Sequence, residues 1–282
     1  MDDADQLEGT GLSLHPTPAE EKLIAAARLG RTCDLSKASD ADRTIRAEVI
    51  RILCIAARPD WPSGERGVAL ENAIVTGELD FRSAALVVPL KLVNCHFDAD
   101  IDLSEAQART TTISSSSIGA FVSDGARFAG NLVLNSTTAS RGISLTRTMV
   151  AGYLDCSSST LQTGNGYALN ADSLDVSGGA FFRDGFAAEG EVNLLGAKVG
   201  KSLDFSGARL ENAGGYALNG PASYVYLTST LATGVAMLIT WRRSDQWTRA
   251  ALVALIPWLA LVVTGPGLPP LSSARRTDPM GP

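Results

Sequence analysis

Residues 150–170 read VAGYLDCSSSTLQTGNGYALN, and residues 199–219 read VGKSLDFSGARLENAGGYALN. The two stretches lie 49 residues apart and are identical at 10 of 21 aligned positions. A weaker copy of the same phrase, VTGELDFRSAAL, occupies residues 75–86. Because identity at a fixed offset indicates that one structural unit was duplicated, we expect a repeat architecture.

Short apolar pairs also recur, with one residue between the two members and about eleven residues between many of the pairs. The pairs are Leu79 and Phe81, Leu90 and Leu92, Ile101 and Leu103, Leu132 and Leu134, Ile143 and Leu145, and Leu154 and Cys156. Such alternation is typical of a strand, and each of these strands is too short to be stable alone. One coil alone cannot bury its apolar side chains, whereas stacked coils bury them against one another. The pattern therefore predicts a mainly β protein, with a right-handed parallel β-solenoid over residues 68–220.

The phrase Leu-Asp-Phe places its two outer residues on one side of the pleat and its aspartate on the other. We therefore expect the interior of the solenoid to contain Leu79, Phe81, Leu154, Cys156, Leu203 and Phe205. The outward-facing carboxylates are then Asp80, Asp102, Asp155, Asp175 and Asp204.

Three interpretations of these outward aspartates stay open. They are most simply solvated positions that discourage pairing between strand edges. Paired carboxylates can instead perform general acid/base chemistry, as they do in glycosidases. In the third interpretation, the aspartates form an acidic stripe that mimics nucleic-acid phosphate and competes for a basic partner. We favour the first interpretation.

Residues 17–67 are predicted to form a helical cap. We expect helices over 18–29 and 42–57, where apolar residues recur at helical spacing. Thr17 suits the N-cap of the first helix, and Glu20 stands where a capping box needs it. The basic positions of the second helix are Arg43, Arg46 and Arg51. A solvated helix face is the simpler interpretation of these arginines, and an anion site is the alternative.

Charge and hydropathy change together near residue 220. The chain has 282 residues, of which 45% are hydrophobic, and its net charge is −6. These values favour a folded core and argue against direct nucleic-acid binding. Residues 1–220 carry a net charge of −9, whereas residues 221–282 carry +3. We expect such a change to mark a change of environment.

Residues 221–271 are predicted to form a hydrophobic, helical tail that associates with a membrane. Two apolar stretches, 224–241 and 250–264, are separated by a basic segment. One of these stretches or both could cross the bilayer; alternatively, the first forms a final coil that covers the end of the solenoid. Residues 1–16, which are acidic, and residues 272–282 are predicted to be disordered.

The cysteines and the N-terminus suggest a cytoplasmic location. The acidic N-terminus contains no apolar segment typical of a secretory signal, so we expect the solenoid on the cytoplasmic side of the cell membrane. Cys33, Cys54, Cys95 and Cys156 fit no zinc spacing and are expected to be reduced, small apolar residues. Cys95 precedes His96, which suggests a Cys/His nucleophile, but neighbours on a strand point to opposite faces.

The sequence contains no dinucleotide-binding G-x-G-x-x-G fingerprint, phosphate-binding loop, nucleophile elbow or H-E-x-x-H motif. We therefore assign no catalytic, cofactor-binding or metal-binding residue, and we expect no cofactor. The favoured function is a non-catalytic, membrane-associated scaffold or protein-interaction solenoid. Its protein partner is not identified by the sequence.

Three phrases carry a resemblance to a known group of proteins: GGYALN at 214–219, the stretch over 181–212, and RTIRAEVIRILC at 43–54. Together they resemble actinobacterial, pentapeptide-repeat-like solenoid proteins over residues 17–220. Members of that group are often catalogued as membrane-associated oxidoreductases and tend to place hydrophobic helices after the solenoid. The resemblance implies a pentapeptide-repeat-like fold and, as the alternative function, a membrane-associated oxidoreductase. It carries over no catalytic residue.

Overall fold

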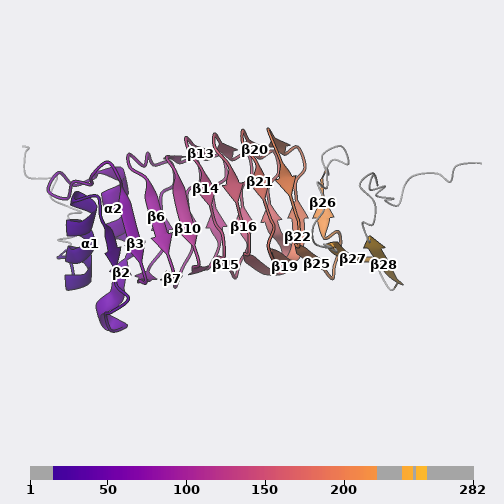
Figure 1. The fold of residues 1–282 in the computed structure, drawn as a ribbon, viewed down its shortest axis with the longest axis horizontal. Helices are drawn as coiled ribbons and strands as arrows, with labels where there is room; N and C mark the ends of the chain where they lie inside the picture. Colours follow the sequence, from indigo (N-terminus) through magenta and orange to yellow (C-terminus); the bar gives the residue numbers. More distant parts are fainter. Residues whose placement is uncertain (1–14, 221–236, 244–245, 253–282) are drawn as a thin grey trace, which may run out of the picture.

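The computed structural model describes residues 15–220, 237–243 and 246–252. They form a parallel β-solenoid of about seven coils, with two α-helices at its N-terminal end (Figure 1). The coils pass through three sheets, which we name sheets A, B and C, and cross sheet B in two columns. A mainly β, parallel solenoid that begins with helices is therefore confirmed.

The strands follow one another in register along each sheet. Sheet A contains β1 (Thr32–Asp34), β3 (Val68–Glu71), β6 (Leu90–Val93), β10 (Thr111–Ser114), β14 (Leu132–Val133), β18 (Leu154–Asp155), β21 (Ala180–Phe181) and β24 (Leu203–Asp204). Sheet C contains β9 (Gln107–Ala108), β13 (Arg127–Phe128), β17 (Met149–Val150), β20 (Asp175–Val176) and β23 (Lys198–Val199).

Sheet B is the largest because it holds two columns of strands. Its first column is β2 (Thr44–Arg46), β4 (Ile74–Thr76), β7 (His96–Phe97), β11 (Ser117–Ile118), β15 (Thr138–Ala139), β19 (Thr160–Asn170), β22 (Ala187–Asn193) and β25 (Arg209–Asn212). Its second column adds β5 (Leu79–Asp80), β8 (Ile101–Asp102), β12 (Phe121–Val122), β16 (Ile143–Ser144) and β26 (Leu218–Asn219). Strands β19 and β22 are long enough to belong to both columns.

The repeat seen in the sequence corresponds to two coils. In sheet A, Leu154 lies beside Ala180, and Ala180 lies beside Leu203. More residues separate the first pair of register partners than the second pair. Both separations are longer than the earlier one, from Leu90 to Thr111. The duplicated unit is therefore a pair of coils of unequal length.

The repeated phrase GYALN lies where the longer coils take up extra residues. Strand β19 changes register between Gln162 and Tyr167. In the second copy, the phrase follows β25 and ends in β26 of sheet B. Tyr167 is 48% exposed and Tyr216 is 45% exposed, so both tyrosines stand on the surface rather than in the core. The phrase therefore marks a corner of the coil.

The interior of the solenoid is a continuous apolar column. Five of the six predicted interior side chains are buried: Leu79, Phe81, Leu154, Cys156 and Phe205. Leu203 packs against the same core but is only half-buried. Its strand β24 is the last strand of sheet A among the described residues, so no further described coil lies over it.

Helix α1 (Pro18–Arg28) begins where the sequence predicts. The hydroxyl of Thr17 accepts a hydrogen bond from the backbone N–H of Glu20 at 3.3 Å, and the Glu20 carboxylate accepts one from the backbone N–H of Thr17 at 2.8 Å. This reciprocal arrangement is a capping box. The buried Glu20 carboxylate also accepts three hydrogen bonds from Arg46, which ties α1 to β2.

The second predicted helix is shorter than expected. Helix α2 spans Ala47–Ile55, and the residues before it form a short 3₁₀ helix, η1 (Ala41–Arg43), and strand β2. The prediction of a helix from residue 42 is therefore wrong. The β-branched Thr44 and Ile45 favour an extended backbone, and β2 pairs with β4 along its whole length. Because β1 pairs with β3 as well, the cap begins sheets A and B instead of being purely helical.

The described parts of the C-terminal tail are strands where the sequence predicts helix. Strand β27 (Met237–Arg243) pairs in parallel with β25, and β28 (Gln246–Leu252) pairs with β27 in antiparallel fashion. The last strand of a sheet leaves backbone N–H and C=O groups unpaired, and β27 pairs those of β25. The rest of the predicted tail, residues 221–236, 244–245 and 253–271, lies outside the described residues, as do residues 1–14 and 272–282. Among the residues that the structure describes, no helix has both the length and the apolar character needed to span a bilayer.

Candidate functional site

The four thiols are buried and poorly suited to nucleophilic chemistry. Burial raises the pKa of Cys33 to about 11, and burial also raises the pKa of Cys95. Because the thiolate is the nucleophile, a raised pKa keeps these groups in their unreactive form near neutral pH. The side chain of His96 is exposed whereas that of Cys95 is buried, so the two residues face opposite sides, as the sequence predicts.

The three arginines of the cap do not converge on an anion site. Each has its own carboxylate: Arg43 pairs with Asp40, Arg46 with Glu20 and Arg51 with Glu48. Arg51 also donates a hydrogen bond to the backbone carbonyl of Asp80 at 2.7 Å, which fastens α2 to the first coil. These side chains therefore hold the cap together.

Most of the predicted outward aspartates shape the corners of the coils. In each case a carboxylate oxygen accepts a hydrogen bond from the backbone N–H two residues later, which defines an Asx-turn. The pairs are Asp80 with Arg82, Asp102 with Ser104, Asp155 with Ser157 and Asp204 with Ser206. All four aspartates are half-buried, so they are not the freely solvated groups that the sequence predicts. The spacing Asp-x-Ser in three of the four phrases is a signal that could have revealed these turns.

The five aspartates do not form one stripe. Asp80 and Asp102 lie in sheet B, Asp155 and Asp204 lie in sheet A, and Asp175 lies in sheet C. The three sheets are different walls of the solenoid. The geometry therefore places these carboxylates on three separate surfaces.

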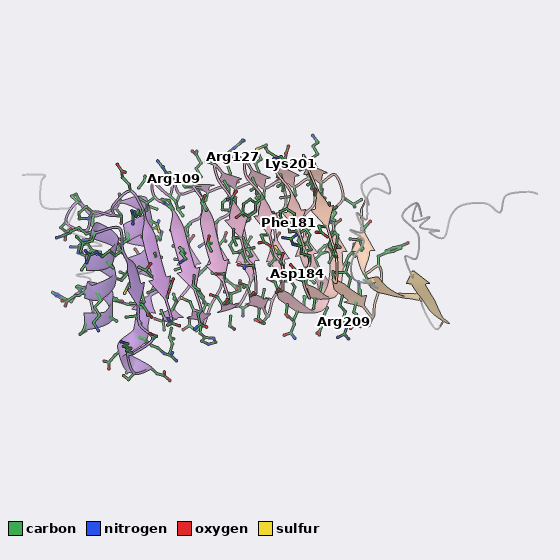
Figure 2. The ribbon with its side chains drawn as sticks, viewed as in Figure 1. Arg109, Arg127, Phe181, Asp184, Lys201 and Arg209 are labelled. Atoms are coloured by element: carbon green, nitrogen blue, oxygen red, sulfur yellow. The ribbon has the colours of Figure 1, made fainter. Side chains whose placement is uncertain are left out.

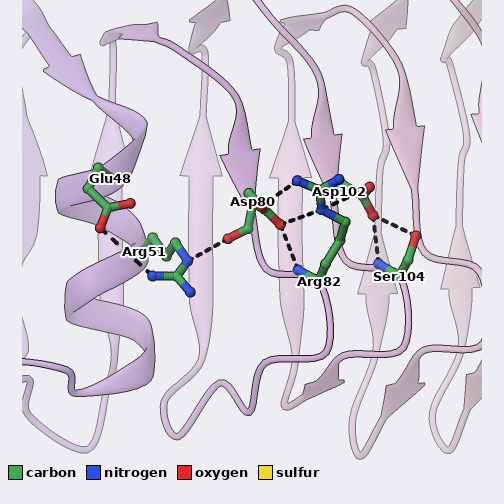
Figure 3. Close-up of polar contacts among 6 residues, drawn as sticks. All are labelled: Glu48, Arg51, Asp80, Arg82, Asp102 and Ser104. Atoms are coloured by element: carbon green, nitrogen blue, oxygen red, sulfur yellow. Dashed lines mark hydrogen bonds and ion pairs between the residues drawn. The ribbon is translucent and has the colours of Figure 1, made fainter. Parts of the chain in front are cut away.

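Asp80 and Asp102 are the closest of the predicted carboxylate pairs, because they are register partners on adjacent coils (Figure 3). The guanidinium of Arg82 lies between them, 2.7 Å from a carboxylate oxygen of Asp80 and 3.8 Å from one of Asp102. The hydrogen bonds from Arg82 hold the pKa of Asp80 below its usual value. A general acid needs a raised pKa, so this arrangement favours a permanently ionised carboxylate.

In sheet A, a phenylalanine separates the other predicted pair. Phe181 is the register partner of both Asp155 and Asp204. The guanidinium of Arg183 stacks over the Phe181 ring at 4.8 Å from its centroid and lies 3.6 Å from Asp204. The ring, labelled in Figure 2, therefore stands between the two carboxylates, and the arginine binds one of them.

Sheet C carries an open groove of about 500 Å³. Its residues come from successive coils, because Gln107, Arg127, Met149 and Asp175 are register partners of one another. Small side chains two residues farther along the same coils form a second row beside these positions: Ala129, Ala151 and Ser177. The groove therefore runs across the strands, along the long axis of the solenoid.

The cations of this groove differ from those of the other two walls. On sheets A and B and their corners, the described arginines and lysines of the coils mostly face carboxylates: Arg82, Lys91, Arg141, Arg183 and Arg209 each form an ion pair. Within the described ranges, no ion pair is formed by Arg109 or Arg127, which line the groove, or by Lys198 and Lys201 beyond it. Figure 2 shows Arg109, Arg127 and Lys201 along one long edge of the molecule.

This groove is not predicted from the sequence. Arg109 and Arg127 are well separated along the chain, and only the coil register of sheet C brings them to one surface. The residues of the groove recur along the chain at the spacing between successive sheet C strands. Because the coils differ in length, this spacing varies and is hard to recognise in the sequence.

Within the part of the chain that the structure covers, no three histidine, cysteine, aspartate or glutamate side chains form a cluster that could hold a metal ion. Comparisons of the chain with protein-family models, with curated proteins and with solved structures give no match.

Proposed function

We propose that this protein is a non-catalytic interaction scaffold that works at the cytoplasmic side of the cell membrane. The observation that carries the proposal is the groove of sheet C, an elongated surface lined by two arginines that have no carboxylate partner among the described residues. Its floor is built from rigid, stacked strands over an apolar core, which is a suitable base for a preformed binding surface.

The polar groups of the other walls support the same proposal. Asp80, Asp102, Asp155 and Asp204 each engage the backbone of their own coil in a turn. Arg82 and Arg183 bind carboxylates of neighbouring coils. These groups build the scaffold, whereas the cations of sheet C remain for a partner.

The proposal includes a right-handed, pentapeptide-repeat-like coil and a membrane-associating tail. Parallel crossover connections are nearly always right-handed, which supports the first part. The apolar stretch 250–264 and the basic Arg242, Arg243 and Arg249 support the second part, because apolar burial and attraction to an anionic leaflet act together.

Site-specific photocrosslinking in native cells tests the scaffold. A benzophenone amino acid is placed at Met149, an exposed residue of the groove, and at Thr138, an exposed residue of sheet B. We expect a discrete protein adduct from position 149 and none from position 138. Equal adducts from both positions, or none from either, contradict a binding role for sheet C.

A further inference from the structure

The occupant of the groove must match its charge. Arg109 and Arg127 lie on the second and third of the five coils that line it, and Lys198 and Lys201 lie beyond the Asp175 end, without ion pairs in the described part of the chain. Charge-assisted hydrogen bonds from arginine to carboxylate are stronger than neutral ones and have a defined geometry. The chemistry of this surface therefore suits a partner that presents carboxylates.

The shape of the groove suits a single extended chain. Adjacent strands lie about 4.8 Å apart, so the four steps from Ala85 to Asp175 span roughly 19 Å. An extended peptide rises about 3.3 Å per residue, so about six residues fill that length. Ala129 and Ala151 leave room for a peptide backbone beside the row of longer side chains.

Two positions of the groove, Met149 and Asp175, determine which kinds of peptide residue fit beside them. Met149 is 43% exposed, and its sulfur accepts a hydrogen bond from Arg127 at 2.9 Å. Methionine adapts its shape to apolar partners, so an apolar residue fits there. Asp175 lies at the far end and disfavours a carboxylate placed directly beside it, whereas its register partner Lys198, one coil farther on, is a cation.

The same aspartate disfavours nucleic acid. The phosphates of a nucleic acid place a negative charge at every nucleotide, so a strand that filled the groove would bring one of these charges next to Asp175. A peptide can place a neutral or basic residue at that position. Vesicles with anionic lipid are the other alternative occupant, and the binding experiment below tests them.

We infer that the groove of sheet C binds an extended acidic peptide segment of a partner protein, with carboxylates at Arg109 and Arg127, an apolar residue at Met149 and a residue that is not acidic at Asp175. This inference rests on the proposed scaffold function and specifies its partner.

Fluorescence anisotropy with the full-length protein tests the inference. The probe is a labelled peptide of sequence AEAELAQA, and the reference probe is AQAQLAQA. We expect saturable binding of the acidic probe and at least about tenfold weaker binding of the neutral one. The double variant Arg109→Gln with Arg127→Gln should lose at least about tenfold in affinity for the acidic probe.

A matched control separates the groove from general charge. Lys91→Gln with Arg141→Gln removes the same charge from exposed cations of other walls and should change the affinity by less than about twofold. Asp175→Asn should strengthen binding of an all-acidic probe, AEAEAEAE, and leave the circular dichroism spectrum of the protein unchanged. Equal losses in the two double variants overturn the inference.

Two further outcomes separate this inference from the proposed function. If duplex DNA or vesicles with anionic lipid bind more tightly than the acidic probe and compete with it at the groove, the peptide inference is overturned. If the adduct at position 149 forms with a partner but excess acidic probe does not reduce it, the scaffold function stands and the peptide chemistry is wrong. If no adduct forms, the scaffold function itself falls.

Discussion

At the scale of single residues, one short phrase performs two tasks. In Leu154-Asp155-Cys156, the apolar residues are fully buried in the column, and Asp155 accepts a hydrogen bond from the backbone N–H of Ser157 at 2.9 Å. The leucine supplies the core and the aspartate bends the chain toward the next wall. Because the carboxylate of Asp155 accepts this backbone hydrogen bond, its main role is to stabilise the turn.

We predict that Leu154→Ala lowers the free energy of unfolding by about 2–5 kcal/mol, as truncations in a packed core do. Leu203→Ala should cost less, because Leu203 is only half-buried. Asp155→Asn should cost under about 1 kcal/mol, because the amide oxygen can accept the same hydrogen bond from Ser157. Urea unfolding of the full chain measures all three, and equal losses for Leu154→Ala and Asp155→Asn would contradict the assignment of inward and outward positions.

At the scale of elements, an ion pair holds the cap together and strand pairing joins it to the solenoid. Glu20 of α1 accepts hydrogen bonds from Arg46 of β2, and β2 in turn pairs with β4 of the first coil. The strands β1 and β2 cover the edges that β3 and β4 would otherwise expose. The cap therefore ends the sheets as well as covering their apolar end.

The Glu20–Arg46 pair predicts acid sensitivity of the cap. Burial raises the pKa of Glu20, but the hydrogen bonds from Arg46 and Thr17 together lower it by more, so the folded pKa lies below the ordinary 4.5. The ionised group therefore stabilises the folded state above the unfolded pKa, and this contribution is lost as the pH falls through the folded value.

We expect Glu20→Gln to lower the free energy of unfolding by about 1–3 kcal/mol at pH 7 and by much less at pH 3. Urea melts followed by circular dichroism at both pH values measure this difference. The control is Glu48→Gln, because Glu48 is exposed and its ion pair with Arg51 is long, at 3.8 Å. A loss that is the same at both pH values would show that the carboxylate charge does not stabilise the cap.

Removal of the cap should expose both sheet edges. We predict that a chain lacking residues 1–66 is insoluble or aggregated, because β3 and β4 then present unpaired backbone groups beside apolar side chains. A chain lacking residues 1–14 serves as the control and should remain soluble. Size-exclusion chromatography and circular dichroism compare the two chains. A monomeric, folded product from the longer deletion would mean that the solenoid does not need its cap.

At the scale of the whole molecule, the sequence predicts what is local and misses what depends on register. The alternation in Leu79-Asp80-Phe81 is visible within the phrase itself and predicts the interior positions, and the recurrence of such phrases along the chain predicts the solenoid. The strand Thr44–Arg46 was missed because its partner β4 lies beyond α2, in the first coil. The groove was missed for the same reason, since Arg109 and Arg127 meet only after the coils are stacked.

The C-terminal tail leads to a prediction at this scale. Apolar burial contributes about 25 cal/mol per Å², whereas each basic residue near an anionic leaflet adds about 1 kcal/mol, so apolar contacts should dominate attachment. We expect the full-length protein to stay in the membrane fraction after a high-salt wash and to leave it with detergent. Leu255→Asp with Leu259→Asp should weaken attachment, whereas changing Arg242, Arg243 and Arg249 together to Gln should weaken it less. Recovery of the unmodified chain as a monodisperse species in the low-salt supernatant would contradict membrane attachment.

The unequal coils have a mechanical consequence. The strands lie across the long axis and each coil contacts only its neighbours, so a force applied to the two ends peels one coil from the stack at a time. Shorter and longer coils would then release different contour lengths, roughly 70–90 Å each at about 3.5 Å per residue. An optical trap would record a staircase of unequal steps, with the longest steps at the coils that contain the GYALN corners.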